Sequence, residues 1–294
     1  MRDNVLIGSA AVRGGTLTSY QLRTRYRALF PDVYLPDFVE PSLRDRTVGA
    51  WLWSRRRATI AGLAAAALHG SCWVDDHEPV ELIWGNTHPP SNVVVRNERI
   101  GSDEITRVAG LPVTTPARTA FDLGRHLPRE QALARLDALT RATPFAIEDV
   151  MLLAKRYRGA RGTRRLREVL PLVDGGAASP RETWLRLLLV DAGLPAPTTQ
   201  IPVVDGWTPF AVLDMGWEDF QVAAEYDGDQ HRTDRRQYVR DIERQRKLER
   251  MGWLLVRVIA EDCPKDIIER VRRALIRRGW RVNTPPVRAK GSRH

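Results

Sequence analysis

The sequence predicts a mixed α/β protein of the α+β class. It predicts a small unit of helices and a hairpin, then a mixed and later helical middle, and finally a unit in the order αβββαβ. Two observations support this class: helical and strand periods succeed one another along the chain, and the break DGGAASP sets the last unit apart. The 294 residues allow two or three domains, and 43% apolar residues suffice for buried cores. We expect domains over residues 1–60, 61–173 and 174–280, with a basic tail over residues 281–294.

The first 60 residues predict a winged-helix-like DNA-binding unit. The apolar run VLIGSAAV predicts a short helix that ends at a Gly-Gly pair. A second helix begins at Thr18, which has capping-box spacing to Gln21, and apolar residues then follow at helical spacing as far as Leu29. The segment PDVYLPDF alternates between prolines and predicts a strand or wing. Three arginines beside the second helix are candidate DNA contacts: Arg23, Arg25 and Arg27.

The middle of the chain predicts a mixed region followed by helices. The alanine-rich segment TIAGLAAAALHG predicts a helix with Gly70 as its C-cap. VELIWG and NVVVRN predict strands because they are rich in β-branched residues. TTPARTAFDLGRH predicts a helix that Thr115 caps and that has Pro116 in its first turn. Residues 128–172 are expected to be helical and basic.

The last unit has a clear order of elements. SPRETWLRLLLVDAG predicts a helix in which Ser179 is the cap and Glu182 closes a capping box. Three strands follow, TTQIPVV, PFAVLDMGW and FQVAAEYDG, and the last two are expected to pair as a hairpin. A long polar helix over residues 233–250, the buried strand WLLVRVI and an amphipathic helix over residues 266–278 complete the unit.

Positive charge is concentrated at the two ends of the chain. Residues 232–294 hold 19 lysines and arginines against 8 acids, and residues 1–60 hold 10 against 5. The whole chain has a net charge of +10, so the middle is net negative. Only four of the 46 basic residues are lysines, and an arginine-rich codon usage explains that preference but not the segregation. Segregated positive charge favours a polyanionic partner, most simply nucleic acid.

The sequence predicts a cytoplasmic protein without a membrane partner. No apolar run approaches the roughly 18 residues of a membrane span. The N-terminal apolar stretch is too short for a secretory signal. Cys72 and Cys263 form neither a metal-ligand nor a disulfide pattern, and we expect both to be reduced and buried.

Carboxylates occur at the end of a strand that the pattern predicts to be buried. FQVAAEYDG carries Glu225 and Asp227, and an unpaired buried carboxylate costs several kcal/mol in order of magnitude. With a two-residue turn at the Glu-Asp pair of WEDF, Asp214 lies opposite Ala223 and diagonal to Glu225 on the same face. Grouped carboxylates suit Mg²⁺ or Mn²⁺, whereas zinc is not indicated because no Cys/His set accompanies them. Each acid also has a local explanation, as a strand end, a turn residue or an ion-pair partner.

This C-terminal constellation resembles the PD-(D/E)XK nuclease superfamily. The residues that carry the resemblance are the αβββαβ order, Asp214, the apolar hairpin and Glu225. EYDGDQH, followed by Asp241, Arg244 and GWLLVRV, resembles the Vsr-like branch, the very-short-patch-repair endonucleases. The resemblance covers residues 179–280 and implies a restriction-endonuclease-like fold. The catalytic residues that it implies are Asp214, Glu225, Asp227, Glu182 and His231, of which Asp214, Glu225 and Asp227 bind the metal.

The chain departs from that superfamily at Asp227, which stands where the superfamily usually has a lysine. Asp227 cannot supply a positive charge, although it could be a further metal ligand. Arg244 or Lys247 on the next helix could supply the charge instead. That helix also provides the expected phosphate contacts, which are Arg240, Arg244 and Lys247.

The front of the chain resembles the AbiEi-type antitoxins of toxin–antitoxin systems. The segments that carry this resemblance are LTSYQLRTRYRALFPDVYLP, ATIAGLAAAALHG and LPVTTPARTAFDLGRH, within roughly residues 1–130. The resemblance implies an N-terminal winged helix that binds operator DNA and a second domain that neutralises a toxin.

The sequence thus leads to functions of different classes. The first is a Mg²⁺-dependent endonuclease that cuts DNA phosphodiesters, including structured or mismatched DNA, and is guided by the winged helix. The alternative is an antitoxin-like DNA-binding transcriptional regulator with a catalytically inactive nuclease fold, which the missing lysine favours. A third is an RNA-binding or protein-interaction module. The expected partners are DNA, a cognate toxin or a second copy of the chain, and the sequence leaves open strandedness, oligomeric state and pathway.

Overall fold

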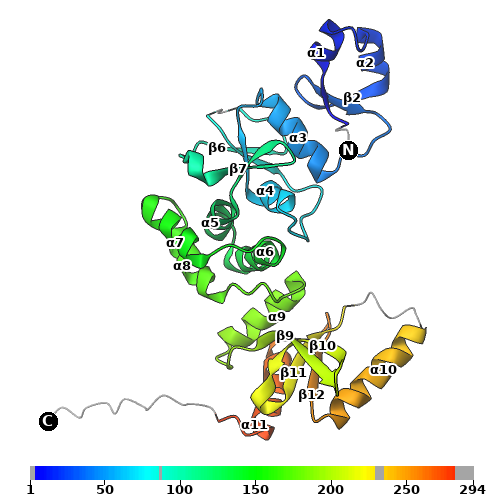
Figure 1. Ribbon diagram of the computed structural model, residues 1–294, viewed down its shortest axis with the longest axis vertical. Helices are drawn as coiled ribbons and strands as arrows, with labels where there is room; N and C mark the ends of the chain where they lie inside the picture. The colour runs from blue at the N-terminus through cyan, green and yellow to red at the C-terminus, as the bar shows by residue number, and fades with distance from the viewer. Residues whose placement is uncertain (1–3, 86–87, 229–234, 282–294) are drawn as a thin grey trace, which may run out of the picture. The chain divides into compact units, whose positions relative to one another are not determined.

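A computed structural model describes residues 4–85, 88–228 and 235–281 (Figure 1). The described residues form eleven α-helices and three β-sheets, which confirms the α+β class. The chain divides into two compact units, Met1–Pro180 and Arg181–His294, so the division falls at the first residue of α9. No described helix combines the length and the apolar content that crossing a membrane requires.

The first elements build the winged-helix-like unit. In order they are β1 (Leu6–Ile7), α1 (Gly8–Arg13), α2 (Ser19–Arg25), β2 (Tyr26–Phe30) and β3 (Val33–Pro36). The strands form an antiparallel sheet in the order β1-β3-β2, so the hairpin β2–β3 follows two short helices as a wing does. The capping box between Thr18 and Gln21 is confirmed, with both of its hydrogen bonds present.

Two boundaries in this unit differ from the prediction. The first apolar run begins as strand β1, and its helix starts only at Gly8. The second helix ends at Arg25, because Tyr26 to Phe30 pair with β3 instead of continuing the helix. The apolar residues at helical spacing therefore lie partly in a strand. Long-range pairing outweighs the local period here, and aromatic residues suit a strand well.

The middle of the first unit contains a five-stranded mixed sheet in the order β6-β5-β4-β8-β7. Its strands and the helices beside them are α3 (Leu43–Trp53), β4 (Thr59–Ala61), α4 (Gly62–Leu68), β5 (Val80–Ile83), β6 (Val93–Arg96), η1 (Ser102–Glu104), β7 (Ile105–Val108) and β8 (Leu111–Thr114). The predicted strands VELIWG and NVVVRN are confirmed as β5 and β6. The start of the alanine-rich segment is a central strand, not a helix, because Ile60 pairs with both Leu82 and Val113.

The rest of the first unit is helical, as predicted. The helices are α5 (Pro116–His126), α6 (Arg129–Ala142), α7 (Ile147–Arg156), α8 (Thr163–Val169) and the 3₁₀ turn η2 (Leu170–Leu172). Thr115 caps α5 by accepting a hydrogen bond from the Arg118 N–H. Helix α5 packs against α6, α7 and α8, and its residues from Arg118 to Arg125 are all buried.

The second unit has the predicted αβββαβ order. Its elements are α9 (Pro180–Asp191), β9 (Thr198–Asp205), β10 (Thr208–Trp217), η3 (Glu218–Phe220), β11 (Val222–Tyr226), α10 (Arg235–Arg250), β12 (Leu254–Val258) and α11 (Pro264–Arg277). The sheet order is β12-β11-β10-β9, with β11 and β12 parallel and the other pairs antiparallel.

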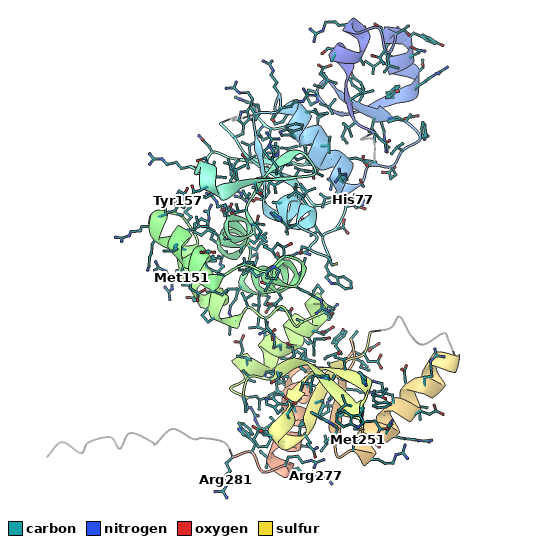
Figure 2. The ribbon with its side chains drawn as sticks, viewed as in Figure 1. His77, Met151, Tyr157, Met251, Arg277 and Arg281 are labelled. Carbon is teal, nitrogen blue, oxygen red and sulfur yellow. The ribbon has the colours of Figure 1, made fainter. Side chains whose placement is uncertain are left out.

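Two apolar clusters hold this unit together. One joins α9 and α11 to the sheet and includes Val222 and Ala224, as the alternation predicted. The other joins Leu248 of α10 to Ala223 and to residues of β9 and β10, and Met251 packs against it (Figure 2). Adjacent residues of β11 thus enter different clusters, which is the consequence of side-chain alternation in a strand covered on both faces.

The hairpin register and the cysteines differ from the prediction. Trp217 pairs with Val222 and Gly216 pairs with Ala223, so Asp214 does not lie opposite Ala223. The connection is four residues long because η3 is followed by Gln221 in a left-handed conformation, with φ of 49°. This shift is an even number of residues, so it keeps every side chain on its predicted face. Both cysteines are free, but they are exposed and not buried.

Candidate functional site

Three acidic side chains of the second unit lie in or beside its core. Glu182 is in the first turn of α9, Asp214 is on β10 and Glu225 is on β11. Glu182 and Glu225 are each only 8% exposed, and Asp214 is half-buried. The structure therefore places three of the predicted catalytic residues in buried or half-buried positions on neighbouring elements. We refer to Glu182, Asp214 and Glu225 as the acid cluster.

Asp214 has the most perturbed environment of the cluster. Its Oδ2 accepts a hydrogen bond of 3.0 Å from the Tyr226 N–H. Burial, together with the negative charges of Glu182 and then Glu225, raises the pKa of Asp214 to about 7. The carboxyl group therefore binds a proton near neutral pH, which lowers the charge that the core has to hold.

Glu225 is paired with an arginine of the next helix. The Arg244 guanidinium makes two bonds to the carboxylate, Nη2 to Oε1 at 2.6 Å and Nη1 to Oε2 at 3.1 Å. It also donates to the Val212 carbonyl at 3.0 Å, so it joins α10 to both β10 and β11. The hydrogen bond to Glu225 raises the pKa of Arg244. Such two-pronged, charge-assisted pairs are among the strong polar contacts of proteins.

Glu182 accepts a hydrogen bond of 3.3 Å from the Gln200 side-chain amide of β9. The cluster thus has a neutral donor at Glu182, a cation at Glu225 and a proton at Asp214. In this arrangement the acid cluster does not surround a site for Mg²⁺, because Arg244 already neutralises the carboxylate of Glu225. The metal assignment therefore stays a prediction, and we derive no catalytic step through a metal ion.

The other residues predicted for this site lie apart from the acid cluster or are engaged elsewhere. Asp227 is exposed beyond the end of β11, where its N–H donates to the Val258 carbonyl. His231 lies outside the described residues. Arg240 is exposed on α10. Lys247 pairs with Asp205 at 2.5 Å, and its ammonium lies 4.1 Å from the centre of the Phe210 ring.

The predicted DNA contacts of the first unit differ in their availability. Arg23 and Arg25 are exposed on α2. Arg27 is on β2, where it pairs with Glu40 at 3.0 Å and donates to a backbone carbonyl. Arg23 and Arg25 are therefore free to meet a polyanion, whereas Arg27 has a structural role.

One basic segment of this unit was not predicted from the sequence. Arg55, Arg56 and Arg57 are exposed between α3 and β4. The first two have positive φ angles of 55° and 61°, which are uncommon for residues other than glycine. The run of three consecutive arginines in the sequence is the signal that predicts it.

A second group that was not predicted from the sequence is a buried ion-pair network on α5. Arg118 donates from Nε to Asp122 at 3.0 Å and from Nη1 to Glu104. Arg125 donates from Nη2 to Asp122 at 2.9 Å and also to Glu98. The Arg118 and Arg125 side chains are only 1% and 3% exposed. The spacing of arginine, aspartate and arginine along ARTAFDLGRH, which places them on one helical face, was the signal.

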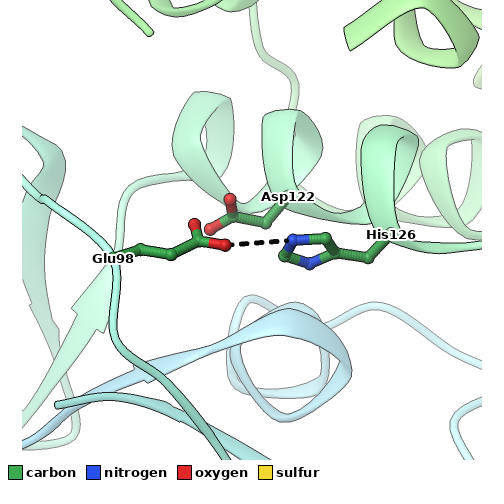
Figure 3. A group of neighbouring side chains, drawn as sticks. All are labelled: Glu98, Asp122 and His126. Carbon is green, nitrogen blue, oxygen red and sulfur yellow. Dashed lines mark ion pairs between the residues drawn. The ribbon is translucent and has the colours of Figure 1, made fainter. Parts of the chain in front are cut away.

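Within this network, Glu98, Asp122 and His126 bring their ligand atoms within 4.8 Å of one another, the spacing of a possible metal site (Figure 3). Charge argues against a metal there, because Arg118 and Arg125 each bond to both Glu98 and Asp122. Burial opposes ionisation of Glu98, but bonds from His126 and Arg125 lower its pKa to about 2. The two carboxylates are thus neutralised by guanidinium groups, which a dication would have to displace.

Comparison with known proteins places this network in a recognised domain. A family model described as the AbiEi antitoxin C-terminal domain matches residues 60–172. Two Mycobacterium tuberculosis proteins, "Uncharacterized protein MT2308" of strain CDC 1551 / Oshkosh and "Uncharacterized protein Rv2248" of strain ATCC 25618 / H37Rv, are each 32% identical over 230 residues. The matched region is 77% of this chain and 83% of each relative. The chain belongs to the same family as these two proteins.

The predicted AbiEi-like resemblance is confirmed for the domain over residues 60–172, called the AbiEi-like domain below. The five-stranded sheet without the first residue of β4, together with α4 to α8, makes up this domain. No solved structure matches the chain significantly. The comparisons lend no support to the nuclease resemblance of the second unit.

Proposed function

We propose that the protein is a DNA-binding transcriptional regulator of the antitoxin type. The observation that carries this proposal is the match of residues 60–172 to the AbiEi antitoxin C-terminal domain. A winged-helix-like unit precedes that domain within the same compact unit. In this proposal the winged-helix-like unit binds DNA, and the AbiEi-like domain meets a protein partner such as a cognate toxin.

The exposed side chains of α2 support DNA binding. Tyr20 is 69% exposed near the start of the helix, and Arg23 and Arg25 follow on its exposed surface. A short helix that is held by a capping box and followed by a wing can present such residues to a groove, while arginines neutralise phosphates. The basic run at Arg55 to Arg57 belongs to the same compact unit and adds positive charge to it.

Selection of binding sites from random duplex DNA with the full chain, followed by titration, tests the proposal. The variant Arg23→Ala/Arg25→Ala should weaken binding and reduce the slope of log K against log salt by about 2, since two phosphate contacts are lost. Arg164→Ala is the control, because the Arg164 side chain is 94% exposed on α8 and the substitution removes one surface charge from the same unit. An unchanged affinity in the double variant, or no selected sequence, would contradict DNA recognition through α2.

A second candidate function is metal-dependent cleavage of DNA by the second unit. One observation favours it: the αβββαβ order places Glu182, Asp214 and Glu225 close enough for the first and last to raise the pKa of Asp214. In this candidate, Mg²⁺ or Mn²⁺ would have to displace the proton of Asp214 and the Arg244 partner of Glu225.

A cleavage assay on duplex, mismatched and single-stranded DNA separates the two candidates. Cleavage that requires Mg²⁺ or Mn²⁺ and disappears in Asp214→Asn, with DNA binding intact, would establish the nuclease. Arg240→Ala is the control for lost phosphate contacts, because Arg240 is exposed on α10 and is not part of the acid cluster. If no substrate is cleaved and sequence-specific binding is retained, the nuclease candidate is excluded and the proposal of a transcriptional regulator stands.

A further inference from the structure

We propose that an arginine-lined cavity of the AbiEi-like domain binds a phosphate-bearing small molecule of nucleotide size. The cavity has a volume of about 490 Å³. It is lined by the segment after β6, one side of α5 and the segment that follows α7. This inference does not depend on DNA binding by the first residues of the chain.

Two buried arginines are part of the cavity lining, and their positions are fixed. Arg118 and Arg125 both line it, and both are held in place by the carboxylates of the α5 network. Because both side chains are almost fully buried and already bonded, no further conformational entropy is lost in ordering this part of the wall when a ligand binds. The α5 network therefore gives the site a rigid, preorganised wall.

Three further arginines of the cavity are not neutralised. Seven arginines line the cavity against a single acid, Glu98. Four of the seven are paired with carboxylates, and these are Arg96, Arg118, Arg125 and Arg156. The other three, Arg99, Arg158 and Arg161, are exposed, and their guanidinium groups have no ion-pair partner among the described residues. The lining thus has a surplus of positive charge that a multivalent anion can compensate.

The chemistry of the lining favours phosphate. Guanidinium groups present planar pairs of donors that match two oxygens of a phosphate, and they stay charged at all physiological pH values. A cation is disfavoured by the same surplus charge. The volume lies within the range of about 300–1,000 Å³ that small-molecule sites occupy.

Tyr157 gives the site an aromatic wall. Its half-buried ring lines the cavity, and its hydroxyl donates to Glu104 at 2.6 Å. The ring orientation is therefore fixed by the same network that fixes Arg118. A ligand with a planar group as well as phosphates, such as a nucleotide, matches an aromatic wall beside arginines better than inorganic phosphate does.

Isothermal titration of ATP, pyrophosphate and inorganic phosphate into the full chain tests the inference. We expect ATP and pyrophosphate to bind, with ATP binding more tightly. In thermal unfolding experiments, both should raise the melting temperature of the chain. Arg158→Ala/Arg161→Ala should weaken ATP binding by about tenfold or more, because two charge-assisted contacts are lost. These two side chains are exposed, so the variant should fold, and an unchanged circular dichroism spectrum checks this.

Two controls make the result specific. Arg164→Ala, a neighbouring exposed arginine that does not line the cavity, should bind ATP as the parent chain does. Arg23→Ala/Arg25→Ala should also keep ATP binding, so loss of DNA recognition and loss of the ligand site are distinguishable. No binding of any phosphate compound, or equal weakening in Arg164→Ala, would overturn the proposal. Binding of a single-stranded oligonucleotide or an acidic peptide at these arginines, with no binding of ATP, would also overturn it.

Discussion

At the residue scale, the acid cluster shows how a half-buried carboxyl group, that of Asp214, is accommodated beside two buried carboxylates. Glu225 has Arg244, and Glu182 has the Gln200 amide. Asp214 accepts a hydrogen bond from the Tyr226 N–H, and its pKa rises to about 7 because burial and two neighbouring acids disfavour its charge. Protonation of the half-buried Asp214 thus avoids a third negative charge beside Glu182 and Glu225.

This pKa predicts a pH dependence of stability. The folded state binds the Asp214 proton more tightly than the unfolded state, where the value is near the ordinary 3.8. The stabilisation is therefore complete below about pH 4 and is lost as the pH rises through 7, at a total cost of roughly 4 kcal/mol. Asp214→Asn, which stays neutral, should be more stable than the parent chain at pH 8 and should flatten the curve.

Urea unfolding between pH 4 and pH 8.5 measures this effect. Asp227→Asn is the matched control, since it removes an exposed carboxylate just beyond the same strand end and should leave the curve as it is. If Asp214→Asn and the parent chain show parallel curves, the carboxyl group is ionised in the folded protein and the cluster has another source of charge compensation.

At the element scale, the junction of β4 and α4 depends on a glycine. Gly62 begins α4 with a φ of +57°, and a Cβ atom there would lie 2.1 Å from Glu81 Oε1. Glu81 is 8% exposed and pairs with Arg96 at 2.5 Å, so its carboxylate cannot move without breaking a mostly buried ion pair. The close approach of α4 to β5 therefore requires the absence of a side chain.

Gly62→Ala should lower the free energy of unfolding by roughly 2–4 kcal/mol, from backbone strain together with the displaced ion pair. Gly110→Ala is the control, because Gly110 also has a positive φ, of +83°, but nothing lies within 4 Å of its Cβ position. Equilibrium unfolding in urea gives both values. An equal loss in the two variants would mean that strain alone acts and that Glu81 has room to move.

At the scale of the whole molecule, the count of 46 basic residues overstates the positive charge that is free to bind a partner. The buried arginines Arg46, Arg118 and Arg125 are used inside the fold, and Arg244 is held by Glu225. Exposed arginines nevertheless remain on several elements: on α2, in the run after α3, around the cavity of the AbiEi-like domain, and on α8, α10 and α11. Positive charge exposed on both compact units suits a protein that meets polyanionic partners.

The sequence by itself determined the features that depend on near neighbours. The Thr18 capping box and the Thr115–Pro116 start of α5 involve residues that are at most three positions apart. The αβββαβ order of the second unit was also predictable, because each element has its own period and its own boundary residues. The buried environment of Glu225 followed from the apolar run before it.

Only the tertiary structure decided the features that depend on residues far apart in the chain. The segment from Tyr26 to Phe30 is a strand because β3 pairs with it. The pairing of Arg244 with Glu225, and of Arg118 with Glu104, joins residues that no local period relates. Such contacts arise from how elements pack, and packing is set by the total buried surface and by the pairing of every buried charge, not by the preferences of any one segment.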